Sequence, residues 1–286
     1  MRILVTGGCG FIGNHVVRNA LLIPGVERVV NLDLLTYSGN LENLKDVDDS
    51  RYQFVHGSIN DSALVETLLG DENISVILHL AAESHVDRSI DSVQPFIETN
   101  VDGTRVLLES IAKRTTAGVP IHFVHVSTDE VYGSLGPKDA AFTEETPLNP
   151  QNPYAASKAA SDMLVQAFIN THKISAIITR CSNNYGPRQH PEKLIPLMTL
   201  NALNNKPLPV YGNGLQIRDW IHVEDHANGV LSAMLALYVG RISSGEVFNF
   251  GADNEQKNID IVKKIISQTS SSDSLINFVK DRPGHD

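Results

Sequence analysis

The chain has 286 residues, 42% of them hydrophobic, and a formal net charge of −10. This length can bury a large core in one extended domain or in two unequal domains. The acidic balance, without a basic cluster, argues against nucleic acid and anionic membrane surfaces as partners. Cys9 and Cys181 lack metal-type spacing and no apolar run is long enough to span a membrane, so we expect a cytoplasmic protein with free thiols.

A glycine-rich turn follows the first apolar strand, which we place at 2–6. Apolar residues then recur at helical spacing from position 12 to 20, so the glycines lie between a strand and a helix. Gly7 permits the tight turn, Gly10 lets the backbone approach a pyrophosphate, and Gly13 allows close packing of helix on strand. The spacing predicts a dinucleotide site at the helix N-terminus.

A second strand, expected over 28–32, ends in Asp33. This acid stands twenty residues after Gly13, where a carboxylate can hydrogen-bond the adenosine ribose and repel a 2′-phosphate. The position therefore favours NAD over NADP.

Further strands are expected at 52–56, 76–80, 121–127 and 175–180, with helices at 62–69, 93–114 and from Tyr154 onward. This alternation predicts an α/β fold, a doubly wound parallel-sheet Rossmann domain with a smaller mixed substrate-binding subdomain. We assign 1–181 to the NAD-binding domain, with 219–250 returning to it, and 182–218 and 251–286 to the subdomain. The expected core face of the helix from Tyr154 consists of Ala156, Ala160, Met163, Leu164, Ala167 and Phe168.

The strand at 121–127 is followed by Thr128, Asp129 and Glu130. In open parallel sheets, ligands bind outside the carboxyl ends of the strands. Two adjacent acids there raise each other's pKa, which suits proton transfer near neutral pH. The alternative interpretation is that both acids cap a helix or occupy a solvated turn.

Tyr154 and Lys158 are four residues apart, so they share one face of a helix. An ammonium beside a phenol lowers the pKa of the phenol and makes tyrosine a usable base against an alcohol. The alternative is a surface tyrosine and lysine that are neighbours by chance.

His222 and His226 have a spacing that can hold zinc. Their order does not match the His-Glu-x-x-His helix, and no third ligand is evident. We therefore expect no metal and interpret Asp225 as a residue that starts a helix.

Together these motifs resemble the nucleotide-sugar 4,6-dehydratases of the extended short-chain dehydrogenase/reductase superfamily, most closely the members that act on dTDP-glucose. The resemblance covers essentially the whole chain. Related 4-epimerases share the Tyr and Lys but usually have small residues where Asp129 and Glu130 stand, so these acids discriminate best. The specific stretches are 81–89, 127–133, 154–158, 183–187, 191–196 and 282–286.

The resemblance implies a hydro-lyase of deoxysugar biosynthesis. Tyr154, assisted by Lys158 and Thr128, would take the C4 hydroxyl proton while hydride leaves for a tightly bound NAD. Glu130 would remove the C5 proton and Asp129 would protonate the departing C6 hydroxyl. Hydride would then return to C6, giving a 4-keto-6-deoxy sugar and regenerating NAD.

The resemblance also implies the binding residues. Those expected to contact the cofactor are Gly7, Gly10, Phe11, Ile12, Gly13, Asp33, Leu34, Thr36, Ser58, Ile59, Leu80, Ala81, Ala82, Ser84, Thr99, Tyr154, Lys158 and Asn184. Those expected to contact the sugar nucleotide are Ser84, Thr128, Asn183, Lys193, Leu194, Pro209, Tyr211, Arg218 and Asn254.

Three alternatives stay open: a 4-epimerase, a 4,6-dehydratase for UDP- or CDP-glucose, and a non-catalytic NAD-sensing protein. The resemblance further implies a homodimer built from the helices at 93–114 and 154–172, and a small domain that continues beyond Asp286.

Overall fold

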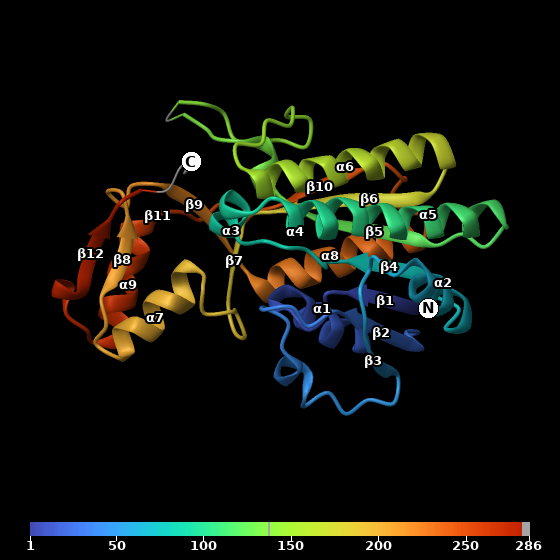
Figure 1. The fold of residues 1–286 in the computed structure, drawn as a ribbon, viewed down its shortest axis with the longest axis horizontal. Coiled ribbons are helices and arrows are strands. Elements are labelled where there is room, and N and C mark those ends of the chain that lie inside the picture. The colour runs from blue at the N-terminus through green and yellow to red at the C-terminus, as the bar shows by residue number, and fades with distance from the viewer. Residues whose placement is uncertain (137, 282–286) are drawn as a thin grey trace.

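The computed structural model describes residues 1–136 and 138–281, so the stretch 282–286 quoted above lies outside the described residues. Seven parallel strands form the large sheet in the order β10-β6-β5-β4-β1-β2-β3. This order and the flanking helices confirm the predicted doubly wound α/β fold (Figure 1). The strands are β1 (Arg2–Thr6), β2 (Arg28–Asp33), β3 (Tyr52–His56), β4 (Val76–His79), β5 (His122–Thr128), β6 (Ser175–Cys181) and β10 (Val247–Phe250).

Helices cover both faces of this sheet (Figure 1). One face packs on α1 (Phe11–Leu21) and α8 (Val223–Tyr238), which contribute Val16, Val230 and Met234 to a fully buried core. The other face packs on α2 (Ser62–Asp71), α5 (Gly103–Thr116) and α6 (Pro153–His172). Because both faces are covered, the strands are apolar along their length, and this made them recognisable in the sequence.

The helical stretch expected over 93–114 is present but interrupted. It consists of α4 (Gln94–Phe96), a π-helical turn at Ile97–Asp102 and then α5. Short α3 (Val86–Asp91) precedes it. A π-turn carries one extra residue per turn, and such turns occur often at functional sites.

The expected core face of α6 is only partly right. Leu164 and Phe168 pack against the core, but Met163 is 66% exposed and Ala156 and Ala167 are also exposed. The buried side is instead largely polar, because Asp162 accepts a hydrogen bond from Arg180 Nε at 2.9 Å and lies 3.3 Å from His125 Nε2. These partners lie on β6 and β5, and hydrophobic periodicity cannot reveal them.

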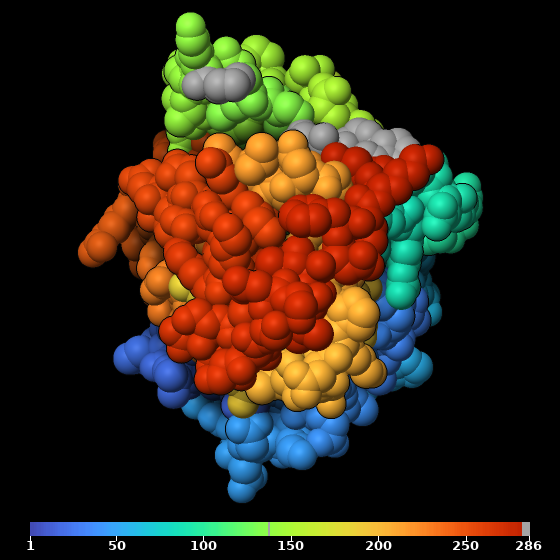
Figure 2. Space-filling view, turned by 90° about the vertical axis from the view of Figure 1, so that its left-hand side faces the viewer, coloured from blue at the N-terminus to red at the C-terminus, as the bar shows by residue number. Residues whose placement is uncertain are grey.

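A smaller α/β part lies at one end of the molecule (Figures 1 and 2). It has one sheet of β11-β9-β7 and a pair β12-β8. Its core is made by α7 (Leu194–Leu203) and α9 (Asn258–Thr269), packed on β8 through residues such as Met198 and Val262. The strands are β7 (Asn183–Tyr185), β8 (Leu208–Tyr211), β9 (Ile217–His222), β11 (Glu255–Lys257) and β12 (Ile276–Val279).

One expectation about the chain path needs correction. The segment beginning at Asp219 forms part of β9, which pairs with β7 and β11 and not with the large sheet. The return to the large sheet therefore starts with α8 and is completed by β10, which pairs with β6. None of the helices within residues 1–136 and 138–281 combines the length and hydropathy of a membrane span.

Candidate active site

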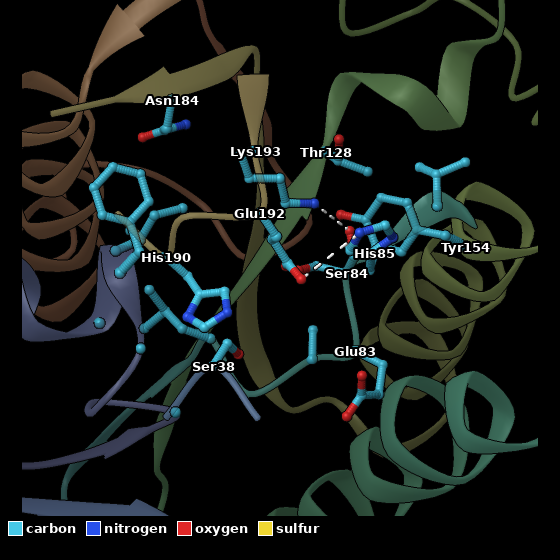
Figure 3. Close-up of a pocket in the computed structure, with 18 of the residues that line it drawn as sticks. Ser38, Glu83, Ser84, His85, Thr128, Tyr154, Asn184, His190, Glu192 and Lys193 are labelled. Atoms are coloured by element: carbon cyan, nitrogen blue, oxygen red, sulfur yellow. Dashed lines mark hydrogen bonds and ion pairs between the residues drawn. The ribbon is translucent and has the colours of Figure 1, made fainter. Parts of the chain in front are cut away.

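A cavity of about 730 Å³ lies at the carboxyl ends of the parallel strands. Its wall is built from the segments that follow β1 to β6 and from residues of the smaller part, including Lys193 and Tyr211. Figure 3 shows side chains of both parts directed into it. Parallel topology brings strand ends together at one edge, so residues far apart in the chain meet there.

The glycine turn forms one end of the cavity. Gly7 has φ +73°, and a Cβ at this position would lie 2.7 Å from the backbone of Ala81. A Cβ on Gly13 would lie 2.1 Å from the Gly7 carbonyl oxygen. Gly10 precedes α1 in extended conformation and offers no capping side chain. The helix N-terminus therefore faces the cavity with free amides, which fits a dinucleotide diphosphate.

Asp33 closes β2 beside this turn. Its side chain is buried, lines the cavity, and accepts hydrogen bonds from the backbone N–H of Cys9 and Leu35, both at 2.8 Å. Two amides thus fix the carboxylate as an acceptor. A ribose diol can donate to such a carboxylate, whereas a phosphate dianion would be repelled.

The π-turn shapes the wall opposite. Asn100, which it carries, is buried and bonds both backbone groups of Glu83, accepting from the N–H and donating to the carbonyl at 2.9 Å each. Its amide also donates to Ser157 Oγ on α6. The extra residue of the π-turn therefore ties the loop after β4 to the helix that carries Tyr154.

The acid pair follows β5 in a short 3₁₀ turn, Asp129–Tyr132. Thr128 Oγ1 accepts from the N–H of Glu130 at 3.3 Å and donates to Asp129 Oδ1 at 3.3 Å. Asn152, the N-cap of α6, donates to Glu130 Oε2 at 3.2 Å. Both carboxylates are only partly exposed and line the cavity, so they are not simply a solvated turn.

Tyr154 lies in the first turn of α6 and is 9% exposed. Burial, followed by the charge of Glu130, raises the pKa of Tyr154 well above its usual value, while a hydrogen bond with Thr128 opposes this. The expected lowering of this pKa is wrong for the structure without ligands, because the net shift is upward and Lys158 is not among its causes. The Nζ of Lys158 donates to the Val126 carbonyl at 2.9 Å. Burial lowers the pKa of Lys158 itself to about 8.

The smaller part lines the other end of the cavity. Lys193 Nζ donates to the Ser84 carbonyl at 2.9 Å, and Tyr211 Oη donates to Asp87 Oδ2 at 3.4 Å. Asn183, Leu194, Pro209 and Arg218 also line this end.

Asn254 is the predicted site residue that the cavity does not include. Its backbone N–H donates to Asp219 Oδ1 at 2.8 Å and its side chain to the Trp220 carbonyl at 3.4 Å, so it serves the turn after β10. Every other residue predicted for the site lines the cavity.

Sequence reasoning missed Glu83, His85, His190 and Glu192, which also line the cavity (Figure 3). Glu192 lay within a stretch that carried the family resemblance, but no spacing rule pointed to its partners. The available signal for Glu192 was its position directly before Lys193, which was predicted to bind the sugar nucleotide.

The two histidines with zinc-type spacing make other contacts. His222 caps α8 by accepting from the N–H of Glu224, and His226 is buried against Asn184 Oδ1 at 2.9 Å. Among the residues that the structure describes, no three potential metal ligands gather in one place.

Comparison with known proteins reveals the family. The sequence profile described as GDP-mannose 4,6 dehydratase matches residues 4–286. The dTDP-glucose 4,6-dehydratase of Neisseria meningitidis serogroup B is 48% identical over 303 residues, which cover 100% of this chain and 83% of the relative.

Solved structures agree with the sequence relatives. The crystal structure of DesIV, a dTDP-glucose 4,6-dehydratase from Streptomyces venezuelae with NAD and TYD bound, superposes with a TM-score of 0.92 at 46% identity. The superposition covers 100% of this chain and 86% of the DesIV chain. A UDP-glucuronic acid 4-epimerase from Bacillus cereus, solved with UDP-glucuronic acid and NAD, gives 0.89 at 30% identity, covering 100% of this chain and 88% of its own. The chain therefore belongs to the GDP-mannose 4,6 dehydratase family, within the extended short-chain dehydrogenase/reductase superfamily.

Proposed function

We propose that this chain is an NAD-dependent dTDP-glucose 4,6-dehydratase, a hydro-lyase that forms dTDP-4-keto-6-deoxyglucose and water. The observation that carries the proposal is that Thr128, Asp129, Glu130 and Tyr154 line the same cavity as the glycine turn. The relatives that are nearly half identical over the whole chain carry this activity in their names.

The glycine turn and Asp33 would hold NAD, which would supply a hydride acceptor for C4 and a hydride donor for C6 and so would end each turnover in its starting form. Tyr154 takes the C4 hydroxyl proton as a phenolate and becomes the neutral phenol. Its hydrogen bond with Thr128 favours the phenolate form that this step requires. Lys158 holds the carboxyl end of β5 through the Val126 carbonyl and adds positive charge beside the site.

Oxidation at C4 acidifies the C5 hydrogen of the sugar, because the carbanion left behind is stabilised by the new ketone. Glu130 removes this proton as a carboxylate that Asn152 orients. Asp129 donates a proton to the C6 hydroxyl, which leaves as water. Glu130 finally returns its proton to C5 as the hydride reaches C6.

The test is incubation of the enzyme with a panel of dTDP-, UDP- and CDP-glucose, followed by mass spectrometry of the nucleotide sugars. We expect loss of one water from dTDP-glucose at the highest kcat/KM. Preference for UDP- or CDP-glucose would replace the proposed nucleotide, and no dehydration of any member would overturn the proposal.

The second candidate is a 4-epimerase, favoured by the close superposition on the Bacillus cereus enzyme. Epimerisation needs oxidation and reduction at C4 but no acid for the C6 hydroxyl. The placement of Asp129 and Glu130 in the cavity favours dehydration. Appearance of the C4 epimer without loss of water would decide for the epimerase.

We also propose a homodimer formed by α5 and α6 with their symmetry mates. Support comes from the apolar side chains that remain exposed near this face: Ile90, Val93, Ile97 and Met163. We retain the division into an NAD-binding domain over 1–181 and a substrate-binding subdomain as a proposal. The two free, buried thiols support a cytoplasmic location.

A further inference from the structure

The segment 187–193, between β7 and α7, crosses the cavity and is fastened on both sides. At its start, the Pro187 carbonyl lies 3.1 Å from His15 Nε2 on α1. At its end, Lys193 Nζ donates to the Ser84 carbonyl, in the loop after β4. We call residues 187–193 the strap.

Glu192 forms the central fastening. Its Oε1 accepts from Tyr37 Oη at 3.2 Å, and its Oε2 lies 3.7 Å from His85 Nε2 and 3.8 Å from Arg88 Nη2. Figure 3 shows the Glu192 side chain directed from the strap toward His85. One carboxylate thus joins the strap, the loop after β2 and the start of α3.

The same residues also contact each other. The Arg88 guanidinium carbon lies 3.7 Å from the centre of the Tyr37 ring, and His190 of the strap packs edge-on against that ring at 5.8 Å. The Arg88 side chain is 52% exposed, whereas that of Glu192 is 13% exposed. The cluster therefore stands between solvent and the cavity.

We propose that the strap retains the cofactor and that Glu192 is the positioning residue that holds it closed. The loop after β2 carries Leu34 and Thr36, and the loop after β4 carries Ala81 to Ser84, so the strap joins two walls of the cofactor half. A dinucleotide lying between the glycine turn and Tyr154 can leave only when these walls separate. This role of the strap rests on the proposed function, which requires NAD in the cavity.

Retention suits the proposed chemistry. A cofactor that ends each turnover in its starting form need not leave the protein. Each dissociation would leave the enzyme inactive until another NAD molecule bound. The strap also carries Lys193 on the substrate side, so one segment would serve both ligands. In this proposal Tyr37, Arg88 and Glu192 act through the walls that their contacts join.

The experiment measures cofactor exchange without sugar nucleotide. The enzyme is loaded with NAD and mixed with excess isotope-labelled NAD, and retained cofactor is followed by rapid desalting and mass spectrometry. Glu192→Ala is expected to shorten the exchange half-time about tenfold or more, because it removes the charge-assisted hydrogen bond with Tyr37 and also the ion pairs with His85 and Arg88. Tyr37→Phe is expected to have a smaller effect of roughly threefold, since it removes the hydrogen bond and leaves the ion pairs.

The matched control is Glu42→Gln, which removes an exposed carboxylate paired with Lys45 just beyond the same loop. Its half-time should equal that of the parent. The double variant Glu192→Ala with Tyr37→Phe should exchange no faster than Glu192→Ala alone, because both changes break one bond. Raised salt should accelerate the parent but not Glu192→Ala, since half-exposed ion pairs are screened.

An exchange half-time of Glu192→Ala within twofold of the parent would overturn the proposal, as would an equal effect of Glu42→Gln. If Glu192→Ala does not fold, judged by its melting transition, Tyr37→Phe decides alone. Product formation by the parent is scored separately, so an enzyme that dehydrates dTDP-glucose but whose variants exchange normally refutes only the strap.

Discussion

At the scale of single residues, each group assigned to acid–base work is held by a partner that limits its freedom. The amide of Asn152 points at Glu130, the hydroxyl of Thr128 bonds Tyr154, and the Val126 carbonyl accepts from Lys158. Such contacts fix reacting groups before substrate arrives. In the proposed mechanism, oxidation at C4 depends on Tyr154, whereas elimination depends on Asp129 and Glu130.

That separation predicts different blocks in two variants. Glu130→Gln keeps its shape and its contact with Asn152 but cannot take the C5 proton, so we expect oxidation at C4 and then a stall. Tyr154→Phe should be blocked before oxidation. The near-ultraviolet absorbance of reduced nicotinamide, read after adding dTDP-glucose, should rise only in the first. We expect kcat to fall by roughly 10²–10⁴ in both. Formation of deoxysugar by Glu130→Gln at the parent rate would show that another base acts.

Lys158 predicts a pH effect on stability. Burial lowers its pKa in the folded protein to about 8, against an ordinary 10.5. Between these two pKa values Lys158 is protonated in the unfolded chain and neutral in the folded protein. The free energy of unfolding therefore rises with pH from about 8 to 10.5. Over that interval the parent should gain up to roughly 3 kcal/mol relative to Lys158→Met, measured by urea unfolding without ligands. An unfolding difference that does not change with pH would contradict the burial effect.

Much of the site could be predicted at this scale, because glycine spacing, Asp33 and the Tyr154–Lys158 pair are local patterns. What local patterns could not give depended on distance and burial. The pKa of Tyr154 is set by its surroundings, and the contacts of Asn254 with Asp219 and Trp220 arise only in the folded chain. Glu192 acquires its partners only when three loops meet.

At the scale of elements, the strands of the large sheet were predicted to within a residue or two, since their apolar runs are bounded by turns. The short strands β7, β8, β11 and β12 of the smaller part were not predicted. The buried face of α6 could not be, because its polar side chains are matched by partners on β5 and β6. The π-turn was equally invisible, because an extra residue in a helix leaves the apolar pattern almost intact. Both features arise from tertiary contacts.

The π-turn predicts the effect of Asn100→Ala. This change leaves both backbone groups of Glu83 without their partner in a half-buried loop, at a cost of about 1–3 kcal/mol. Urea unfolding should show that loss, and KM for dTDP-glucose should rise because the neighbouring Ser84 lines the cavity. Asn170→Ala, an exposed position on α6, is the control and should change neither value.

At the scale of the whole molecule, the exposed apolar side of α6 predicts how the proposed dimer breaks. Met163→Lys places a charge in the contact, and an unpaired buried charge costs several kcal/mol. Sedimentation should therefore show a dimer for the parent and a dissociation constant raised at least roughly a hundredfold for the variant. Leu22→Lys, at the exposed position that follows α1, should leave the dimer unchanged. A parent that sediments only as a monomer at micromolar concentration would end the idea.

The strand order of the large sheet bears on how the chain folds as it is synthesised. β1, β2 and β3 assemble outward in one direction, and β4, β5, β6 and finally β10 extend the other side. Each newly emerging strand therefore finds an open edge beside one already in place, and none must be inserted between two paired neighbours. Until residues 247–250 leave the ribosome, β6 presents an uncovered edge able to pair with another nascent chain. The final strand covers β6 and completes the sheet, after which the edge on this side is the four-residue strand β10. Short edge strands offer little backbone for pairing with another chain.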